Sequence, residues 1–375
     1  MNCKKTQHSM EIFIPKEKFK VLVRCYTYNH APYIEDALKG FSMQETDFPY
    51  VCVVVDDAST DGEREVIVSF LDNNCVGGYN VMDLDYSELI LATHKDNSNC
   101  HFAVYLLKEN LYKQKNKKKA LVDPWREVCV YEATCEGDDY WTDSQKLQKQ
   151  VDFLEGHPDY SFSCTGFDFL NQSTNGILSG GDVINANVSI INANSDISLS
   201  ILDGTLFRIQ PMTVVYRLSS YEKIAPFLDK QRGLFLMGDT QTWVYLLQVG
   251  NLHYLPDITA VYRLNEGSAC RQKMMKKRVR FDLSIAEMRV YMADEINAPQ
   301  EYKVKFQKSY QKKLNIYYCY DKDYRHFVEI KFYSVKDKIQ YYVLKSFIVR
   351  PFLKIIYERH YRKLLRESEA SYIKE

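Results

Sequence analysis

Three short runs of mainly apolar residues constrain the fold of this 375-residue chain more than any other feature. The runs span 20–26, 50–55 and 128–135. Continuous apolar runs of this length are typical of parallel strands that are buried on both faces of a sheet. Helices expected after the first two runs give the strand–helix alternation of a sheet that is at least partly parallel. The sequence therefore predicts an α/β fold.

Polar segments follow all three runs at the point where each strand is expected to end. The first run leads into 27–32, the second into 56–62, and the third into 136–141. Ligands of open α/β sheets bind outside the carboxyl ends of the strands, so these segments are the expected place for a site. Asn29 is also suited to cap the helix after the first run.

The third polar segment carries three acids within four residues, Glu136, Asp138 and Asp139. Such acids repel each other unless water, a cation or basic groups offset their charge. A divalent metal ion is the simplest partner, and a solvated turn is the alternative for an Asp–Asp pair. Both Mg²⁺ and Mn²⁺ accept oxygen ligands, so the sequence leaves the choice of metal open.

Two other α/β proteins fit the sequence less well. A dinucleotide-binding Rossmann unit needs a glycine-rich turn after its first strand, and this chain has none at 26–30. A phosphate-accepting receiver domain is suggested by Asp56 and Asp57 at a strand end. That class explains neither the acidic segment 136–141 nor the length of the chain.

Together, the segments 21–29, 53–61 and 136–141 resemble glycosyltransferase family 2, whose members have the GT-A fold. The resemblance covers roughly residues 19–270 in order and spacing, and includes 143–147, 238–243 and 262–268. It implies a Rossmann-like mixed sheet flanked by helices. It also implies inverting transfer of a sugar from a nucleotide-diphosphate donor.

The resemblance also assigns roles to individual residues. Asp138 and Asp139 are implied to hold Mn²⁺ or Mg²⁺, and Asp239 to act as the catalytic base. The implied nucleotide-binding residues are Thr27, Tyr28, Asn29, Asp56, Asp57 and Asp138. Residues implied on the acceptor side or in its loops are Glu136, Trp141, Arg263 and Asn265.

The chain departs from the family pattern at three positions. Gly238 and Asn265 stand where the family often has glutamate and histidine, and Glu136 replaces a commoner aspartate. An amide in place of imidazole removes a metal ligand or proton carrier but keeps hydrogen-bonding capacity. Gly238 and Asn265 leave open a non-catalytic nucleotide-sugar or glycan-binding module of the same fold, whereas Glu136 keeps the negative charge on a longer side chain. Asp239 has a structural alternative too, as an N-cap or first-turn acid of the following helix.

Composition limits the partners and the compartment. With 49 basic and 49 acidic side chains, the chain lacks the positive excess that nucleic-acid binding favours. The basic run 113–119 is either a solvated loop or a source of a lysine for the diphosphate. The ten cysteines include no CxxC pair, so free thiols in a reducing cytosol are expected.

The expected organisation is a catalytic domain at 17–270 followed by a helical, basic and aromatic extension at 271–375. Segment 171–200 is expected to be a loop over the acceptor site. Residues 341–366 combine basic with aromatic and aliphatic side chains, and Pro351 should split them into two helices. This stretch either packs on the catalytic domain or docks on an anionic membrane, in which case the acceptor is a lipid-linked sugar.

These observations lead to one functional hypothesis. The chain is expected to be a metal-dependent inverting transferase of hexosyl or N-acetylhexosaminyl groups. Its donor would be a UDP-sugar, and its acceptor a glycan or lipid-linked sugar of capsule or other surface polysaccharide. No N-terminal leader or apolar stretch of roughly 20 residues is present, so the expected location is the cytoplasm or the inner face of the cell membrane.

Overall fold

A computed structural model describes residues 13–76, 80–112, 114–172, 176–178, 197–204, 209–265 and 274–371. Most of the expected acceptor loop 171–200 therefore lies outside the described residues, as does Lys113 of the basic run.

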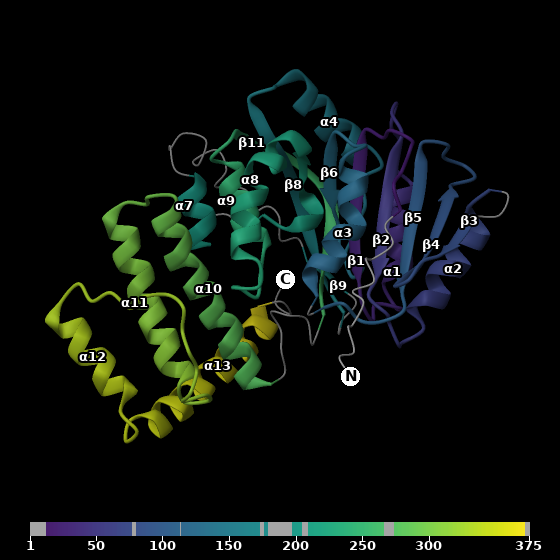
Figure 1. Ribbon diagram of the computed structural model, residues 1–375. Coiled ribbons are helices and arrows are strands. Elements are labelled where there is room, and N and C mark those ends of the chain that lie inside the picture. Colours follow the sequence, from purple (N-terminus) through teal and green to yellow (C-terminus); the bar gives the residue numbers. More distant parts are fainter. Residues whose placement is uncertain are drawn as a thin grey trace, which may run out of the picture. The chain divides into compact units, whose positions relative to one another are not determined.

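The chain forms two compact units, which are described separately (Figure 1). The first comprises Met1–Asn194, Phe207–Pro226 and Tyr245–Arg263. The second comprises Ser195–Leu206, Phe227–Val244 and Leu264–Glu375. The assignment of a catalytic domain to 17–270 and of an extension to 271–375 stays a prediction.

One mixed sheet runs through the first unit. Its strands follow the order β3-β4-β5-β2-β1-β6-β10-β8-β11-β7, and β9 pairs with β8. The strands are β1 Val21–Thr27, β2 Tyr50–Asp56, β3 Asn80–Asp83, β4 Ser87–Thr93, β5 Cys100–Leu107, β6 Tyr131–Thr134, β7 Tyr140–Trp141, β8 Tyr160–Asn171, β9 Gly176–Leu178, β10 Val215–Arg217 and β11 Asn251–Leu264. The helices that begin in this unit are α1 Ile34–Ser42, α2 Glu63–Asn74, α3 Lys115–Arg126, α4 Lys146–Gly156, the short 3₁₀ helix η1 Pro211–Thr213 and α8 Leu218–Gln231.

The three apolar runs form neighbouring parallel strands at the centre of this sheet. Strand β1 pairs in parallel with β2 on one side and with β6 on the other, and β2 pairs in parallel with β5. The pairs β6–β10, β8–β10, β7–β11, β3–β4, β4–β5 and β8–β9 are antiparallel. The predicted α/β fold with a mixed sheet and flanking helices is confirmed.

Both faces of the central strands are buried because successive side chains point to opposite sides. On one face, Val21, Val23 and Cys25 of β1 join a core with residues of α1, α2 and α4. On the other face, Leu22 of β1 packs with β2 side chains and with Trp125 of α3. This two-sided burial explains why the strands are continuously apolar.

A buried ion cluster joins helix α3 to strands β1 and β6. Glu132 is fully buried and accepts from Arg24 Nε at 2.6 Å and from Arg126 Nε at 2.7 Å. Burial by itself would raise the pKa of Glu132, but the two guanidinium groups hold it at about 2. The carboxylate is therefore ionised and fully paired, as a buried charge must be.

The second unit is helical. Its helices are α7 Ile197–Asp203, α10 Met275–Glu295, α11 Gln300–Tyr317, α12 Val335–Lys345 and α13 Arg350–Ser371, and α9 Asp239–Leu246 begins within it. Helices α10 and α11 pack against each other (Figure 1). The predicted C-terminal helices are confirmed, and the stretch 341–366 is divided between two of them as expected. The break lies at 346–349, just before Pro351, which occupies the first turn of α13, where proline is tolerated.

Two further findings concern membrane spans and cysteines. Among the described residues, no helix is long and apolar enough to cross a membrane. The described cysteines are all free thiols, namely Cys25, Cys52, Cys75, Cys100, Cys129, Cys135, Cys164 and Cys319.

Candidate functional site

The polar segments after β1, β2 and β6 meet at the carboxyl edge of the central sheet in the first unit. These three strands are neighbours and run in the same direction, so their ends lie together, as the sequence indicated. Within this unit the structure therefore brings together the loops that carry Thr27, Asp56, Asp57, Asp138 and Asp139.

Asn29 links the loop after β1 to the loop after β2. Its backbone N–H donates to Ser59 Oγ at 2.9 Å, and its Oδ1 accepts from the Thr60 N–H at 2.8 Å. Asn29 has a φ of +57°, a left-handed conformation that asparagine tolerates better than most residues. Asn29 thus has a clear structural role, whereas its contact with a nucleotide stays a prediction.

Glu63, at the start of α2, connects the same two loops, and the sequence analysis gave it no role. Its side chain is fully buried. It accepts from Thr27 Oγ1, from the His30 N–H at 2.8 Å and from Ser59 Oγ at 2.7 Å. The signal that could have found it is the sequence Thr60-Asp61-Gly62-Glu63, a Thr-x-x-Glu pattern typical of a helix start.

Asp56 is buried at the end of β2 and is bonded within its own loop. Its Oδ1 accepts from the Ser59 N–H at 3.1 Å and lies beside Ser59 Oγ. Burial raises the pKa of Asp56 to about 6. The Ser59 hydroxyl lies within hydrogen-bond reach of both Asp56 and Glu63, and its single proton serves one of the two carboxyl groups at a time.

Asp57 is held by two donors from the segment after β5. Its Oδ1 accepts from the Leu111 N–H at 2.6 Å, and its Oδ2 accepts from Lys118 Nζ at 2.7 Å. The expectation of a solvated loop at 113–119 is wrong for most of that run, because residues 115–126 form α3 and Lys118 is mostly buried. Each carboxylate oxygen accepts more than one hydrogen bond, so Asp57 keeps capacity for a ribose or base.

The acidic segment after β6 packs tightly against the end of β1. A Cβ on Gly137 would lie 2.1 Å from Thr27 Oγ1, so only glycine fits there. Asp139 is buried and accepts from the Arg263 N–H at 2.9 Å. Burial and the neighbouring Asp138 raise the pKa of Asp139 well above its usual range. The Asp138 carboxylate is more exposed and lies 3.9 Å from His30 Nε2.

Arg263 belongs to β11, which pairs with β7 beside the acidic segment. Its guanidinium pairs with the Asp36 carboxylate and lies 4.6 Å from the ring centre of Tyr140 and 5.2 Å from that of Tyr33. The side chain is 6% exposed. Arg263 therefore holds the acidic segment in place through its backbone and helix α1 through its side chain.

Two aromatic candidates differ in exposure. Trp141 is buried, donates from Nε1 to the Met212 carbonyl at 2.8 Å and packs edge-on against Phe41. These contacts describe a packing role. Tyr28 is 44% exposed beside the loop after β1, where its ring is available to a planar base.

The remaining candidates, Asp239 and Asn265, belong to the second unit. Asp239 is the first residue of α9, and its Oδ1 accepts from the Gly238 N–H at 3.2 Å. This first-turn position fits the structural alternative and leaves its role as a base a prediction. Asn265 is partly buried and directly follows β11.

The acidic segment suits a metal ion that arrives with phosphate oxygens better than a permanently bound ion. Within the ranges that the structure describes, no group of three or more histidine, cysteine, aspartate or glutamate side chains could hold a metal. Mg²⁺, however, is commonly bound through one or two carboxylates together with substrate phosphates. Asp138 and Asp139 are the candidate pair in this segment, and their role as metal ligands stays a prediction.

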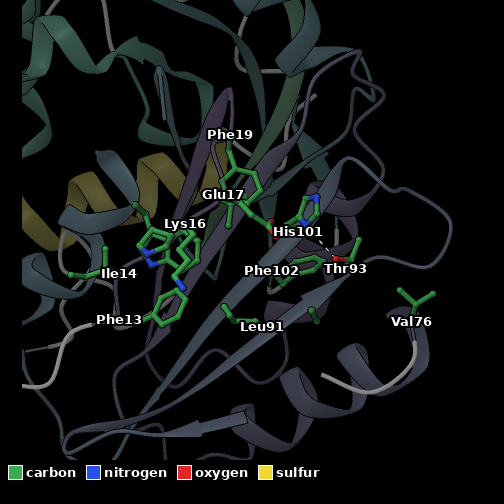
Figure 2. A pocket seen from close by; sticks show the side chains of 14 residues that line it. Phe13, Ile14, Lys16, Glu17, Phe19, Val76, Leu91, Thr93, His101 and Phe102 are labelled. Atoms are coloured by element: carbon green, nitrogen blue, oxygen red, sulfur yellow. Dashed lines mark hydrogen bonds between the residues drawn. The ribbon is translucent and has the colours of Figure 1, made fainter. Parts of the chain in front are cut away.

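A separate cavity of about 400 Å³ is also present in the first unit. Figure 2 shows the side chains that line it. Phe19, at the entry to β1, and His101, at the start of β5, both line it, and their rings are 5.1 Å apart. Thr93 Oγ1 lies 3.2 Å from His101 Nδ1. Because these positions are near the amino ends of the parallel strands, this cavity is distinct from the candidate site.

Comparisons with known proteins find sequence relatives for about a third of the chain. No protein-family model matches the chain. Uncharacterized protein Rv1520 of Mycobacterium tuberculosis is 37% identical over 133 residues, which is 36% of this chain and 31% of that protein. Uncharacterized protein Mb1547 of Mycobacterium bovis matches to the same extent. The aligned region thus spans about a third of the length of these relatives.

Two solved structures show a distant likeness. S. aureus TarS 1–349 in complex with UDP-GlcNAc has 16% identity and a TM-score of 0.46, covering 87% of this chain and 79% of that one. The mannosyltransferase PcManGT from Pyrobaculum calidifontis, in complex with GDP-Man and Mn²⁺, has 13% identity and a TM-score of 0.47, covering 92% and 88%. With TM-scores below 0.5, this likeness does not by itself establish a function.

Proposed function

We propose that this chain is a glycosyltransferase that moves a sugar from a nucleotide-diphosphate donor, a UDP-sugar, to a glycan or lipid-linked acceptor. The observation that carries the proposal is the meeting of the loops after β1, β2 and β6 at one sheet edge, with Asp138 and Asp139 in the last loop. Transfer of a hexosyl or N-acetylhexosaminyl group with inversion, in surface polysaccharide synthesis at the cytoplasmic side, completes the proposal.

The nucleoside would bind at the loops after β1 and β2. Tyr28 offers an exposed ring for stacking on the base, and Asp57 offers acceptor capacity toward the base or ribose. Thr27, Asn29 and Asp56 are bonded to Glu63 or Ser59, so they would shape this part of the site and present backbone groups. The pre-formed loops reduce the entropy lost when the donor binds.

The diphosphate would bind beside the acidic segment. Asp138 and Asp139 would hold Mn²⁺ or Mg²⁺, and the ion, when bound, neutralises negative charge on the leaving diphosphate. Arg263 positions Asp139 through its backbone N–H. Glu136 lies in the same segment and is assigned to the loop rather than to the metal.

Asp239 is the proposed catalytic base, which takes the proton from the acceptor hydroxyl as the new bond forms. No nucleophile is assigned, in keeping with a single inverting displacement. Asn265 is assigned to the acceptor side. Asp239→Asn should lower kcat far more than it weakens donor binding, whereas Asp323→Asn, an exposed aspartate of the same unit, should change neither. Equal losses in kcat and donor binding would assign Asp239 a structural role instead.

Thermal unfolding with nucleotides tests the donor site directly. The purified protein is heated with UDP, GDP or CDP, each with Mn²⁺ or with a chelator. A ligand at about 100 times its Kd adds about 2.7 kcal/mol, which shifts the midpoint measurably. We expect a metal-dependent shift with UDP that Asp139→Asn abolishes and that Asp152→Asn, on the outer face of α4, retains. No shift with any nucleotide would contradict the proposal.

A non-catalytic nucleotide-sugar or glycan-binding module of the same fold is the second candidate. Gly238 and Asn265, which differ from the family pattern, favour it. The two candidates separate when UDP-GlcNAc and GDP-mannose are incubated with mixed acceptors. Transfer or donor hydrolysis that Asp139→Asn abolishes supports the enzyme, whereas nucleotide binding without turnover supports the module.

A further inference from the structure

The second unit exposes an unusual amount of apolar surface where α12 passes into α13. Phe347 is 81% exposed and Ile348 is 63% exposed in the turn between these helices. Phe352, Ile355 and Ile356 follow on α13 and are each at least half exposed. Their spacing of three and four residues places these three on one face of the helix. We call these five residues the apolar corner, and a surface patch of this kind marks an interaction site.

Basic residues are frequent in the sequence around the apolar corner. Residues 345–366 contain seven basic residues and one acidic residue, Glu358. Lys354 and Arg359 are exposed on α13 beside the apolar side chains. Basic charge next to aromatic and aliphatic groups is complementary to an anionic lipid surface, which attracts the charges and accepts the apolar groups.

A cavity of about 1000 Å³ between α10, α11, α12 and α13 adjoins the apolar corner, because Ile356 belongs to both. Asn315 of α11 also lines the cavity and is 1% exposed. Neither its Nδ2 nor its Oδ1 has a hydrogen-bond partner among the described residues. A buried amide without partners is costly, so it marks a place where a polar group from outside would bind. Lys308 and Lys313 line the same cavity and pair with Asp337 at 3.8 Å and Asp282 at 3.1 Å, which also line it. Arg278 and Lys312 complete its charged lining, which therefore has four basic and two acidic side chains.

We propose that the second unit docks on an anionic phospholipid membrane through the apolar corner and takes a lipid headgroup into the adjoining cavity. The apolar corner enters the interface between headgroups and acyl chains, and Lys354 and Arg359 contact the anionic surface. Asn315 hydrogen-bonds the polar part of one bound lipid. This inference does not depend on the proposed sugar transfer, since it uses other residues and a different observable.

Sedimentation with lipid vesicles tests the docking surface on the full chain. Vesicles contain phosphatidylcholine alone or phosphatidylcholine with phosphatidylglycerol, at about 50 mM and about 500 mM salt. We expect binding to the anionic vesicles that weakens at high salt. Each basic residue near the surface contributes roughly 5-fold, so Lys354→Gln with Arg359→Gln should lower the partition coefficient about 30-fold. Lys16→Gln with Lys18→Gln, two exposed lysines of the first unit, should leave it unchanged.

The apolar part has a closely matched control. Ile348→Asp and Ile177→Asp change the same residue type at the same exposure of 63%, but Ile177 lies on β9. Ile348→Asp should reduce vesicle binding at least about 10-fold, and Ile177→Asp should not. Equal binding by the two variants, or no binding of the unmodified chain to anionic vesicles, would overturn the proposal. So would a stable dimer that Ile348→Asp dissociates, since the apolar corner would then bind a second copy.

The headgroup cavity is tested with a soluble short-chain phosphatidylglycerol and with glycerol phosphate as the matching free phosphate. We expect the lipid to raise the thermal midpoint of the chain, and glycerol phosphate to have little effect. Asn315→Leu, which replaces the unpaired amide by an apolar group of similar size, should fold with an equal or higher midpoint and lose the response to lipid. An unchanged response in Asn315→Leu, or an equal response to glycerol phosphate, would contradict the assigned cavity.

Discussion

Replacement of Lys146 by methionine should make the first unit more stable near neutral pH and remove part of its pH dependence. Lys146 is fully buried at the start of α4. Its Nζ donates to Gln150 Oε1 at 2.5 Å, lies 3.5 Å from the Thr213 carbonyl and is 4.8 Å from the ring centre of Trp141. No carboxylate forms an ion pair with it among the described residues. Burial therefore lowers the pKa of Lys146 to about 7.

The magnitude follows from the difference between this pKa and the ordinary lysine value of 10.5. It corresponds to about 5 kcal/mol of differential stabilisation between the two protonation states. Below pH 7 both folded and unfolded states hold the proton, and the folded state carries the full cost of a buried charge. Between pH 7 and 10.5 the unfolded state alone stays protonated, so stability rises by about 1.4 kcal/mol for each pH unit.

The assay is urea unfolding followed by tryptophan fluorescence. A Trp243→Phe background leaves Trp125 and Trp141, both in the core of the first unit, as reporters. From about pH 7.5 to about pH 9, the chain with Lys146 should gain about 2 kcal/mol relative to Lys146→Met. Other groups titrate in this range, but their effects cancel when the two chains are compared at each pH.

Lys149→Met is the matched control on the same helix. Lys149 is partly exposed and bonds Asp143 and Asp257, and these hydrogen bonds raise its pKa. Its replacement should not change the slope of stability between about pH 7.5 and about pH 9. Parallel pH profiles for Lys146→Met and the unmodified chain would refute a depressed lysine pKa and would mean that the buried ammonium stays charged.

Three further substitutions test other parts of the first unit. Gly137→Ala should lower the free energy of unfolding by about 1–3 kcal/mol and weaken UDP binding, because the added Cβ would lie 2.1 Å from Thr27 Oγ1. Urea unfolding measures the loss of stability, and nucleotide titration measures the loss of binding. Glu132→Gln should lower the free energy of unfolding by about 3–5 kcal/mol at neutral pH, because it leaves the buried guanidinium groups of Arg24 and Arg126 without their carboxylate partner. The pKa of Glu132 is lowered from 4.5 to about 2, so the stability difference between the unmodified chain and Glu132→Gln should shrink as pH falls from 4.5 to about 2. Urea unfolding of both chains at several acidic pH values measures this difference. Asp139→Asn should abolish sugar transfer. In the absence of metal it should also raise the thermal midpoint at neutral pH. The raised pKa of Asp139 means that ionisation of this carboxyl group lowers the stability of the fold as pH rises, and asparagine cannot ionise. A lower midpoint would contradict this account.

Part of the candidate site was predictable because it is local in the sequence. The runs that form β1, β2 and β6 were recognised because two-sided burial demands apolar residues at every position. Parallel pairing then places their polar ends together, and this brought Asp57, Asp138 and Asp139 to one sheet edge. Gly137 could have been anticipated as a position of close approach, but its neighbour Thr27 could not.

The partners of the buried polar groups were not predictable, since they come from distant parts of the chain. Lys118 bonds Asp57 from 61 residues away, although its run looked like a solvated loop. The Arg263 N–H donates to Asp139, which is 124 residues away in the sequence, and the pairing of β11 with β7 that brings them together could not be predicted from the sequence. Glu63 was given no role, because a charged side chain in the first turn of a helix usually faces water.

The sequence by itself determined the strand cores, the chain positions of their polar ends and the two-helix form of the C-terminal segment, because periodicity and proline act over a few residues. Only the tertiary structure decided which charged side chains are buried and which groups they pair with. In the folded chain, Lys146 is buried with no carboxylate partner among the described residues, Trp141 lies in the core and the apolar corner is exposed. The physical reason is that desolvation depends on every element packed around a side chain, and that environment exists only after the chain has folded.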